Sequence, residues 1–233
     1  MTNSVAQSVA ERLVRVPAGS VQLDGNLGLS DDARAVVLFA HGSGSSRFSS
    51  RNRYVASLLH DANLATLLID LLTSDEEAID ARTAHLRFDI GLLAKRLVGA
   101  TDWLKQYPAT QNLPIGYFGA STGAAAALVA AAERLETVGA VVSRGGRPDL
   151  AGPALSRVQA PTLLIVGGND TQVIQLNRAA LKQLRCEKQL VIVPRATHLF
   201  EERGALDEVA RLARDWFQRH LVSARQQAAG VGR

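Results

Sequence analysis

Six short apolar runs alternate with helix-like segments along the chain, and this alternation restricts the fold more than any other feature. The runs have the length of strands and cover residues 35–40, 65–71, 115–118, 138–142, 161–166 and 189–193. Unbroken apolar runs of this length are typical of strands buried on both faces of a sheet. Helical patterns lie between or after them, at residues 52–61, 88–106, 123–135, 177–184 and 205–221. Because strand–helix–strand units form right-handed crossovers, this order predicts a doubly wound, mostly parallel α/β sheet with helices on both faces.

Two β-like runs precede the alternating region. They cover residues 12–16 and 20–23, and the three residues between them, from Pro17 to Gly19, form the expected turn. We therefore expect an N-terminal antiparallel hairpin, which brings the sheet to about eight strands.

The length of 233 residues fits one domain, and the 47% apolar and 21% charged residues are ordinary for a globular protein. We expect this domain to cover residues 12–222, with an N-terminal extension at residues 1–11 and a frayed tail at residues 223–233. Residues 72–87 contain four carboxylates and little apolar periodicity. This segment is predicted to be a surface excursion near the ligand site, forming a minimal lid and not a second domain.

Charge and composition disfavour several classes of function. The formal net charge is only +4 and the basic residues are scattered, so no nucleic-acid partner is expected. Cys186 is the only cysteine, so nothing requires an oxidising compartment. The first ten residues lack the pattern of a signal peptide, and the small-residue run at 123–132 is too short to span a bilayer. We expect a cytoplasmic protein with no membrane partner.

One motif follows the third of the apolar runs directly. Residues 119–123 read Gly-Ala-Ser-Thr-Gly, a G-x-S-x-G sequence between a predicted strand and a predicted helix. A sharp turn at this junction would expose the Ser121 hydroxyl above the sheet, and the glycines would remove Cβ atoms that collide there. The amide of Thr122, at the helix start, could then stabilise an oxyanion. The pattern favours Ser121 as a nucleophile over a turn that serves packing alone.

A serine nucleophile needs a base, and the base needs an acceptor that orients it. His198 lies in the loop after the last predicted strand, whereas the other histidines lie on predicted helices, in the excursion or directly after the first buried strand. Asp170 follows the strand at residues 161–166, where ligands bind at the carboxyl edge of such a sheet. Asp149 is the competing carboxylate, but Gly145, Gly146 and Pro148 carry the chain well past its strand before that residue. We therefore expect a catalytic triad of Ser121, Asp170 and His198.

These residues occur in the order Ser, Asp, His, and four motifs lie in register with them: His41-Gly-Ser43-Gly, Gly119-Ala-Ser121-Thr-Gly, Gly168-Asn-Asp170 and Thr197-His198. In this the chain resembles the α/β-hydrolase superfamily, and most of all its compact branch similar to dienelactone hydrolases, over residues 12–222. The resemblance implies hydrolysis of an ester or related acyl bond of a small-molecule substrate through an acyl-enzyme, with no cofactor. One departure concerns the nucleophile, because dienelactone hydrolases use a cysteine where this chain has Ser121.

The resemblance also assigns the loop after the first buried strand. It implies that the amide of Ser43 is the second oxyanion donor, beside the amide of Thr122, and that His41 is structural. The glycine- and serine-rich loop is not followed by the Lys-Ser/Thr pair of a phosphate-binding loop. No metal-binding pattern of histidines or cysteines is present in the sequence either, so no metal is expected.

Arg47 and Arg144 follow two of the predicted strands, so both could reach the mouth of the same site. A guanidinium matches a carboxylate or phosphate in two parallel hydrogen bonds, which makes these residues candidates for binding a substrate anion. The alternative is that they pair with Asp70, Asp75 or Glu76.

Two alternatives to a hydrolase also remain open: a non-catalytic ligand-binding or interaction protein on the same scaffold, and an acyltransferase. The native substrate and the oligomeric state are not predicted.

Overall fold

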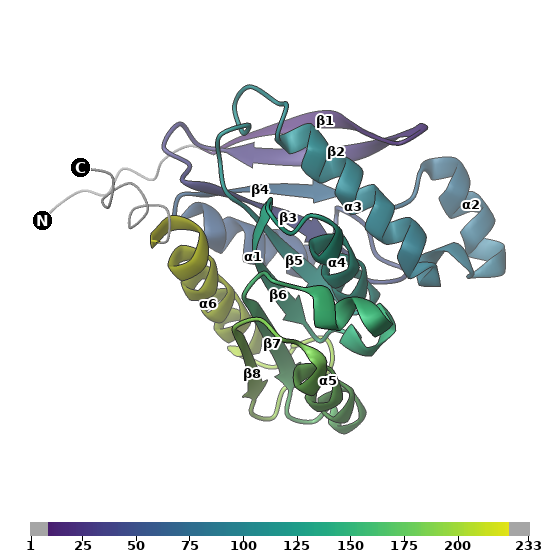
Figure 1. Cartoon of the computed structure of the whole chain (residues 1–233), viewed down its shortest axis with the longest axis vertical. Helices are drawn as coiled ribbons and strands as arrows, with labels where there is room; N and C mark the ends of the chain where they lie inside the picture. Colours follow the sequence, from purple (N-terminus) through teal and green to yellow (C-terminus); the bar gives the residue numbers. More distant parts are fainter. Residues whose placement is uncertain (1–8, 224–233) are drawn as a thin grey trace, which may run out of the picture.

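The computed structural model describes residues 9–223, and the core of this region is one eight-stranded sheet (Figure 1). The strands lie in the order β1-β2-β4-β3-β5-β6-β7-β8. Their bounds are β1 (Ala10–Ala18), β2 (Val21–Leu29), β3 (Ala35–Ala40), β4 (Leu64–Ile69), β5 (Ile115–Ala120), β6 (Val138–Arg144), β7 (Thr162–Gly167) and β8 (Lys188–Val193).

The sheet is parallel except at its N-terminal side. β1 pairs with β2 and β2 pairs with β4 in antiparallel orientation, whereas all other neighbouring strands are parallel. Both the doubly wound sheet and the N-terminal hairpin expected from the sequence are confirmed. Since β5 lies between β3 and β6, the loop after β3 and the turn after β5 meet at the carboxyl edge of the sheet.

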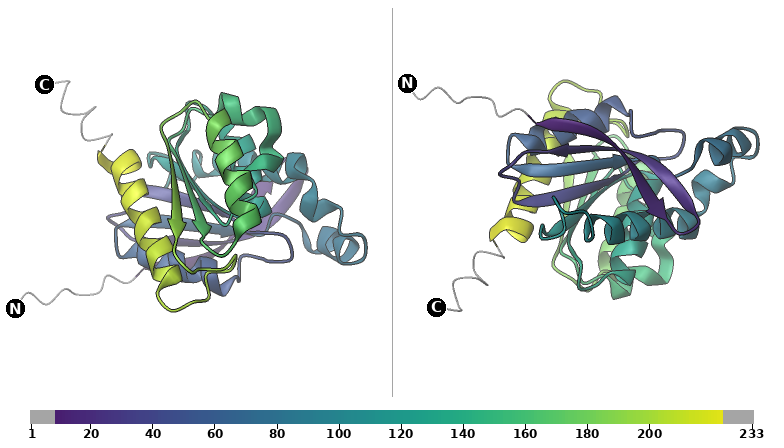
Figure 2. Two further views of the ribbon diagram at one scale, coloured as in Figure 1. Left: turned by 90° about the horizontal axis from the view of Figure 1, so that it is seen from below. Right: turned by 90° about the horizontal axis from the view of Figure 1, so that it is seen from above.

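Helices cover both faces of the sheet (Figure 2). One face packs against α1 (Ser50–His60) and α6 (Ala205–Phe217), and α6 continues into a wider turn, η3 (Gln218–Ser223). The other face packs against α3 (Ile90–Leu104), α4 (Thr122–Glu133), α5 (Thr171–Gln183) and the 3-10 segment η2 (Pro148–Arg157). This sandwich explains why β3 is apolar at every position: Leu38 belongs to the core on the α3 side and Phe39 to the core on the α6 side.

Three boundaries differ from the sequence prediction. The hairpin strands are nine residues each, longer than the apolar pattern indicated, because strand pairing continues through polar and glycine positions of β2. β1 therefore begins at Ala10, inside the predicted extension, and the rest of that extension at residues 1–8 lies outside the described residues, as does the predicted tail from residue 224. α5 begins at Thr171, directly after Asp170, although its first turn has little apolar signal.

The excursion contains a helix of its own, α2 (Ser74–Thr83), followed by the short turn η1 (Leu86–Phe88). α2 projects from the side of the molecule (Figure 2) and buries only Asp80. Its start is stabilised by a capping box, in which Thr73 accepts from the amide of Glu76 and Glu76 accepts from the amide of Thr73. Polar caps thus hold a helix that has almost no apolar face.

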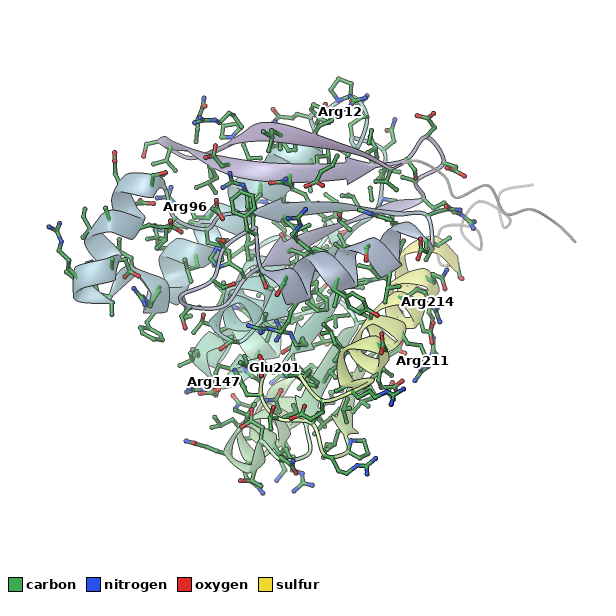
Figure 3. The ribbon with its side chains drawn as sticks, turned by 180° about the vertical axis from the view of Figure 1, so that it is seen from behind. Arg12, Arg96, Arg147, Glu201, Arg211 and Arg214 are labelled. Atoms are coloured by element: carbon green, nitrogen blue, oxygen red, sulfur yellow. The ribbon has the colours of Figure 1, made fainter. Side chains whose placement is uncertain are left out.

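One ion pair attaches this helix to the body, and a second one holds the excursion together internally. Arg96 of α3 lies between the excursion and the end of the hairpin (Figure 3), where it donates to Glu76 Oε1 at 2.5 Å and to the carbonyl of Ala18 at 3.1 Å. Asp80 accepts from Arg87 Nε at 2.5 Å and from the amide of Leu86 at 2.7 Å. The excursion therefore has a defined position beside the carboxyl edge of the sheet.

Within residues 9–223, none of the helices combines the length and the apolar composition that a bilayer span requires.

Candidate active site

Ser121 occupies the turn between β5 and α4 in a strained conformation. Its φ of 50° and ψ of −121° lie outside the regions that non-glycine residues ordinarily adopt. The turn depends on its two glycines, because a Cβ at Gly119 would lie 2.4 Å from Ala124 Cα and a Cβ at Gly123 would lie 2.3 Å from the carbonyl oxygen of Ala40. The chain thus packs tightly on both sides of Ser121 and raises this residue above the edge of the sheet.

His198 and Asp170 form a hydrogen-bonded pair at the ends of two neighbouring strands. His198 lies in the loop after β8 and Asp170 lies between β7 and α5, and Nδ1 of the histidine is 2.6 Å from Oδ2 of the aspartate. Because an ionised carboxylate only accepts hydrogen bonds, Nδ1 carries the proton and Nε2 of the neutral ring is free to accept one. Asp149, the competing carboxylate, is instead held by Arg147 at 2.9 and 2.8 Å.

The turn that holds Ser121 and the loop that holds His198 are connected through the end of β6. The amide of Ser121 donates to the carbonyl of Arg144 at 3.3 Å. The next residue, Gly145, packs against His198, since a Cβ there would lie 3.5 Å from the histidine Cε1. No direct hydrogen bond joins Ser121 to His198 within residues 9–223.

The loop after β3 lies directly against Ser121. A Cβ at Gly42 would be 3.0 Å from the serine Cβ, so a larger residue would push the loop and the turn apart. His41 fixes the loop from below: its Nδ1 lies 2.9 Å from the carbonyl of Gly42, and its Nε2 accepts from the amide of Leu71 at 3.1 Å. Burial lowers the pKa of His41, which keeps the ring neutral and able to make both contacts.

The amide of Ser43 has a hydrogen-bond partner in the structure. This amide, which we expected to be free for an oxyanion, donates to the hydroxyl Oγ1 of Thr122 at 2.9 Å. The amide of Thr122 is the first of α4 and has no acceptor within the helix. Within residues 9–223, the amide of Thr122 thus has no acceptor, whereas the amide of Ser43 is engaged by a hydroxyl.

A cavity of about 520 Å³ adjoins this turn. Ser43 and Thr122 form the end of the cavity near Ser121. Apolar side chains on its walls include Phe48, Leu71 and Leu93, and the excursion contributes Glu77 and Arg87. The excursion predicted to lie near the site is therefore one wall of its cavity.

Neither arginine predicted to bind a substrate anion lines this cavity. Arg47 forms an ion pair with Asp70, donates from Nε to Asn26 Oδ1 at 3.1 Å, and lies over the Phe48 ring at 4.2 Å. Its pairing with Asp70 is the alternative that the sequence left open.

Arg144 is buried, with 6% of its surface exposed, and donates to Asn52 Oδ1 at 3.3 Å. Burial, together with the nearby charge of Arg51, lowers its pKa to about 10. It packs under the histidine loop, with its guanidinium 6.0 Å from the centre of the Phe200 ring, and not toward the cavity.

Arg87 does line the cavity, although it is not among the residues expected there from the sequence. Its Nε and Nη2 are occupied by Asp80, whereas Nη1 lies 3.9 Å from the position that a Cβ of Gly44 would take. Its place in a polar segment with no apolar periodicity gave no signal of a wall residue.

No group of three or more metal-ligating side chains occurs in the part of the chain that the structure describes.

Comparison with known proteins identifies the family. The model of the dienelactone hydrolase family matches residues 24–226. The crystal structure of a dienelactone hydrolase from Anabaena variabilis is similar, with 67% sequence identity, a TM-score of 0.90, and coverage of 91% of this chain and 99% of that one. A protein of Mycobacterium tuberculosis, provisionally named a phosphoribosyl transferase, is 58% identical over 208 residues, which are 89% of this chain and 46% of the relative. The chain thus spans less than half the length of the curated relatives it matches.

More distant solved structures share the fold. Est1E from Butyrivibrio proteoclasticus is 14% identical with a TM-score of 0.74, and covers 89% of this chain and 98% of its own. The dienelactone hydrolase-like promiscuous phosphotriesterase P91 from metagenomic libraries is 16% identical with a TM-score of 0.76, and covers 92% and 99%. The family model covers most of the sequence and the Anabaena structure matches nearly the whole chain, so this chain belongs to the dienelactone hydrolase family.

Proposed function

We propose that the chain is a serine hydrolase that cleaves an ester or related acyl bond of a small molecule through an acyl-enzyme. The observation that carries the proposal is the hydrogen-bonded pair of His198 and Asp170 at the same edge of the sheet as the strained Ser121. A strained serine at a strand-to-helix turn, a histidine with a fixed tautomer and a carboxylate that fixes it are the parts that acyl transfer needs.

In the first half of the reaction, Nε2 of His198 removes the proton from Ser121 as Oγ attacks the substrate carbonyl. The carbonyl oxygen becomes an oxyanion near the start of α4, where the Thr122 amide and the helix dipole stabilise negative charge. His198 then donates its proton to the departing alcohol oxygen. The bond from Ser121 to the acyl carbon remains.

In the second half, His198 removes a proton from water as the water oxygen attacks the acyl carbon. Collapse of the second tetrahedral intermediate breaks the bond to Ser121, returns the proton to its oxygen and releases the carboxylic acid. Asp170 stays ionised and stabilises the imidazolium that forms twice in the cycle. The cavity beside Ser43 and Thr122 would hold the substrate during both steps.

Of the arginines, Arg87 is the one placed to meet a polar or anionic substrate group, through its Nη1. Arg47 and Arg144 would act instead by holding the loop after β3 and the histidine loop.

The test is covalent labelling of the full chain with a fluorophosphonate, read by intact mass and peptide mapping. We expect one adduct, on Ser121, and loss of labelling in Ser121→Ala. Ser156→Ala is the matched control, since Ser156 is an exposed serine in η2 and should leave labelling unchanged. An unlabelled wild type, or equal labelling of Ser121→Ala, contradicts the proposal and favours a ligand-binding protein on the same scaffold.

Turnover of an ester panel with and without an added alcohol acceptor separates hydrolysis from acyl transfer. Hydrolysis predicts the free acid as the main product in both conditions. A product ester that dominates at low millimolar acceptor would identify an acyltransferase.

A further inference from the structure

The contact between Ser43 and Thr122 changes which groups can stabilise the oxyanion. The Ser43 amide has one hydrogen, and that hydrogen points at Thr122 Oγ1 over 2.9 Å. To reach an oxyanion directly, the amide would have to leave this acceptor. The loop has little freedom to do so, because Gly42 is in contact with Ser121 and His41 is held by Leu71.

The Thr122 hydroxyl is both an acceptor and a donor. It accepts the amide of Ser43, and within residues 9–223 no hydrogen-bond acceptor receives its own hydrogen. Thr122 is buried, yet it lines the cavity next to the nucleophile. Its hydroxyl hydrogen is therefore free to point into the space where a substrate carbonyl would lie.

The same residue holds the amide at the start of α4, which is the donor that the nucleophile turn supplies. A hydroxyl that already accepts a hydrogen bond becomes a better donor, because successive hydrogen bonds polarise one another. The hydrogen bond from the Ser43 amide would thus make the Thr122 hydroxyl a stronger hydrogen-bond donor.

We propose that the oxyanion hole of this chain consists of the amide and the hydroxyl of Thr122, with the Ser43 amide acting as the group that orients the hydroxyl. This inference rests on the proposed function of the same site. It makes Thr122 a catalytic residue through its side chain and Ser43 a positioning residue through its backbone. As Ser121 attacks, negative charge develops on the carbonyl oxygen and both donors of Thr122 face it; no proton is transferred to the oxyanion.

The experiment compares Thr122→Val and Thr122→Ser with the wild type on an activated p-nitrophenyl ester. Valine keeps the branched shape and removes the hydroxyl, whereas serine keeps the hydroxyl and removes the methyl group. Loss of one oxyanion donor lowers kcat by about 10² to 10³ in other acyl-transfer enzymes. We expect a fall of about that size in Thr122→Val with little change in KM, and a kcat within about fivefold of wild type in Thr122→Ser.

A boronic acid that forms a tetrahedral adduct with Ser121 supplies a second readout. If the hydroxyl binds the oxyanion, the affinity of Thr122→Val for phenylboronic acid falls in parallel with its kcat/KM. A merely structural role would not produce this parallel loss at an unchanged KM. Thr122→Ala gives the same comparison without a branched side chain if the valine variant does not fold.

Two results would overturn the inference. Wild-type or higher activity in Thr122→Val and Thr122→Ala would show that the Ser43 amide is itself the donor and that the hydroxyl only masks it. Equal impairment of Thr122→Ser and Thr122→Val would show that the hydroxyl is not the group that matters. Failure of the proposed function has a different signature, since a wild type that neither labels nor turns over esters removes both proposals together.

Discussion

At the scale of single residues, the partner of each carboxylate decides its role. Asp170 and Asp149 both follow strands of the parallel sheet, but Asp170 contacts His198 and Asp149 contacts Arg147. The position of Asp170 directly after its strand was enough to favour it from the sequence. The pairing of Asp149 with Arg147, two residues away, explains why the competing carboxylate does not reach the histidine.

Asp170→Asn tests this assignment. The amide would bond to His198 in the wrong tautomer or leave it unoriented, so kcat for an ester should fall by on the order of 10⁴, as in the equivalent change in a serine protease. Asp149→Asn is the matched control and should keep kcat within a few-fold of wild type, because it loses only a partly exposed ion pair. Larger damage from Asp149→Asn than from Asp170→Asn would contradict the pairing seen here.

The buried His41 predicts a pH dependence of stability. Burial lowers its pKa in the folded chain below the ordinary value of 6.5. As the pH falls through that value, the unfolded chain takes up a proton that the folded chain does not, so the free energy of unfolding decreases. The stabilisation is fully present above the unfolded pKa and is lost toward acid pH.

Urea unfolding at pH 7.5 and 5.5 measures this effect. His41→Gln should be less stable than wild type at pH 7.5, because contacts to Gly42 and Leu71 are altered, but it should lose less on going to pH 5.5. Part of the loss should remain, since burial also lowers the pKa of His60 and His220. An equal loss in variant and wild type would exclude His41 as a source of the pH dependence.

At the scale of elements, the excursion shows a helix held by polar contacts alone. α2 buries only Asp80, so its position depends on the capping box and on the pair between Glu76 and Arg96. Arg96 is the more buried partner, with 8% of its side chain exposed. Since Glu77 and Arg87 line the cavity, a displaced α2 would open one wall of the site.

Glu76→Gln separates the cap from the ion pair. Glutamine serves as well as glutamate at this position of a capping box, but it leaves the buried charge of Arg96 without its partner. We expect a loss of about 1.5–3 kcal/mol in the free energy of unfolding, the usual worth of a hydrogen bond to a charged group. Proteolysis should become faster within residues 72–88, and KM for an ester should rise more than kcat falls. Unchanged stability and KM would show that the ion pair does not hold the wall.

At the scale of the whole molecule, one sheet separates two apolar cores. Leu38 belongs to one core and Phe39 to the other, and each side chain is at most 1% exposed. The two tryptophans divide in the same way, with Trp103 on the α3 side and Trp216 on the α6 side. Since the same strands form both cores, we expect the two sides to unfold together.

Leu38→Ala and Phe39→Ala should each lower the free energy of unfolding by about 2–5 kcal/mol, through lost burial and the cavity left behind. Trp103→Phe and Trp216→Phe backgrounds leave one fluorescent reporter on each side of the sheet. Each core substitution should shift the urea midpoint reported by both tryptophans equally. Two separate transitions would show that the cores are independent.

The features that the sequence by itself determined are those set by local physics. Three features depend on residues a few positions apart: the succession of apolar runs along the chain, the glycine-flanked turn at Ser121, and the places of Asp170 and His198 after their strands. The periodicity of a strand and the conformation of a tight turn arise within such distances, so the architecture and the candidate triad could be predicted. The resemblance to the family added the roles expected of Ser43 and His41.

Tertiary structure alone decided the partners of the remaining site residues. The Ser43 amide meets a hydroxyl 79 positions away, Arg144 meets an amide 92 positions away, and Arg47 meets a carboxylate 23 positions away. Each long side chain or loop amide could reach several acceptors, and only the packing of α1, α2 and the loop after β3 on the sheet selects one. For the same reason Arg87 lines the cavity, whereas Arg47 and Arg144 do not. The position of a charged side chain depends on the distant elements that bury it or pair with it, and no local sequence pattern encodes those contacts.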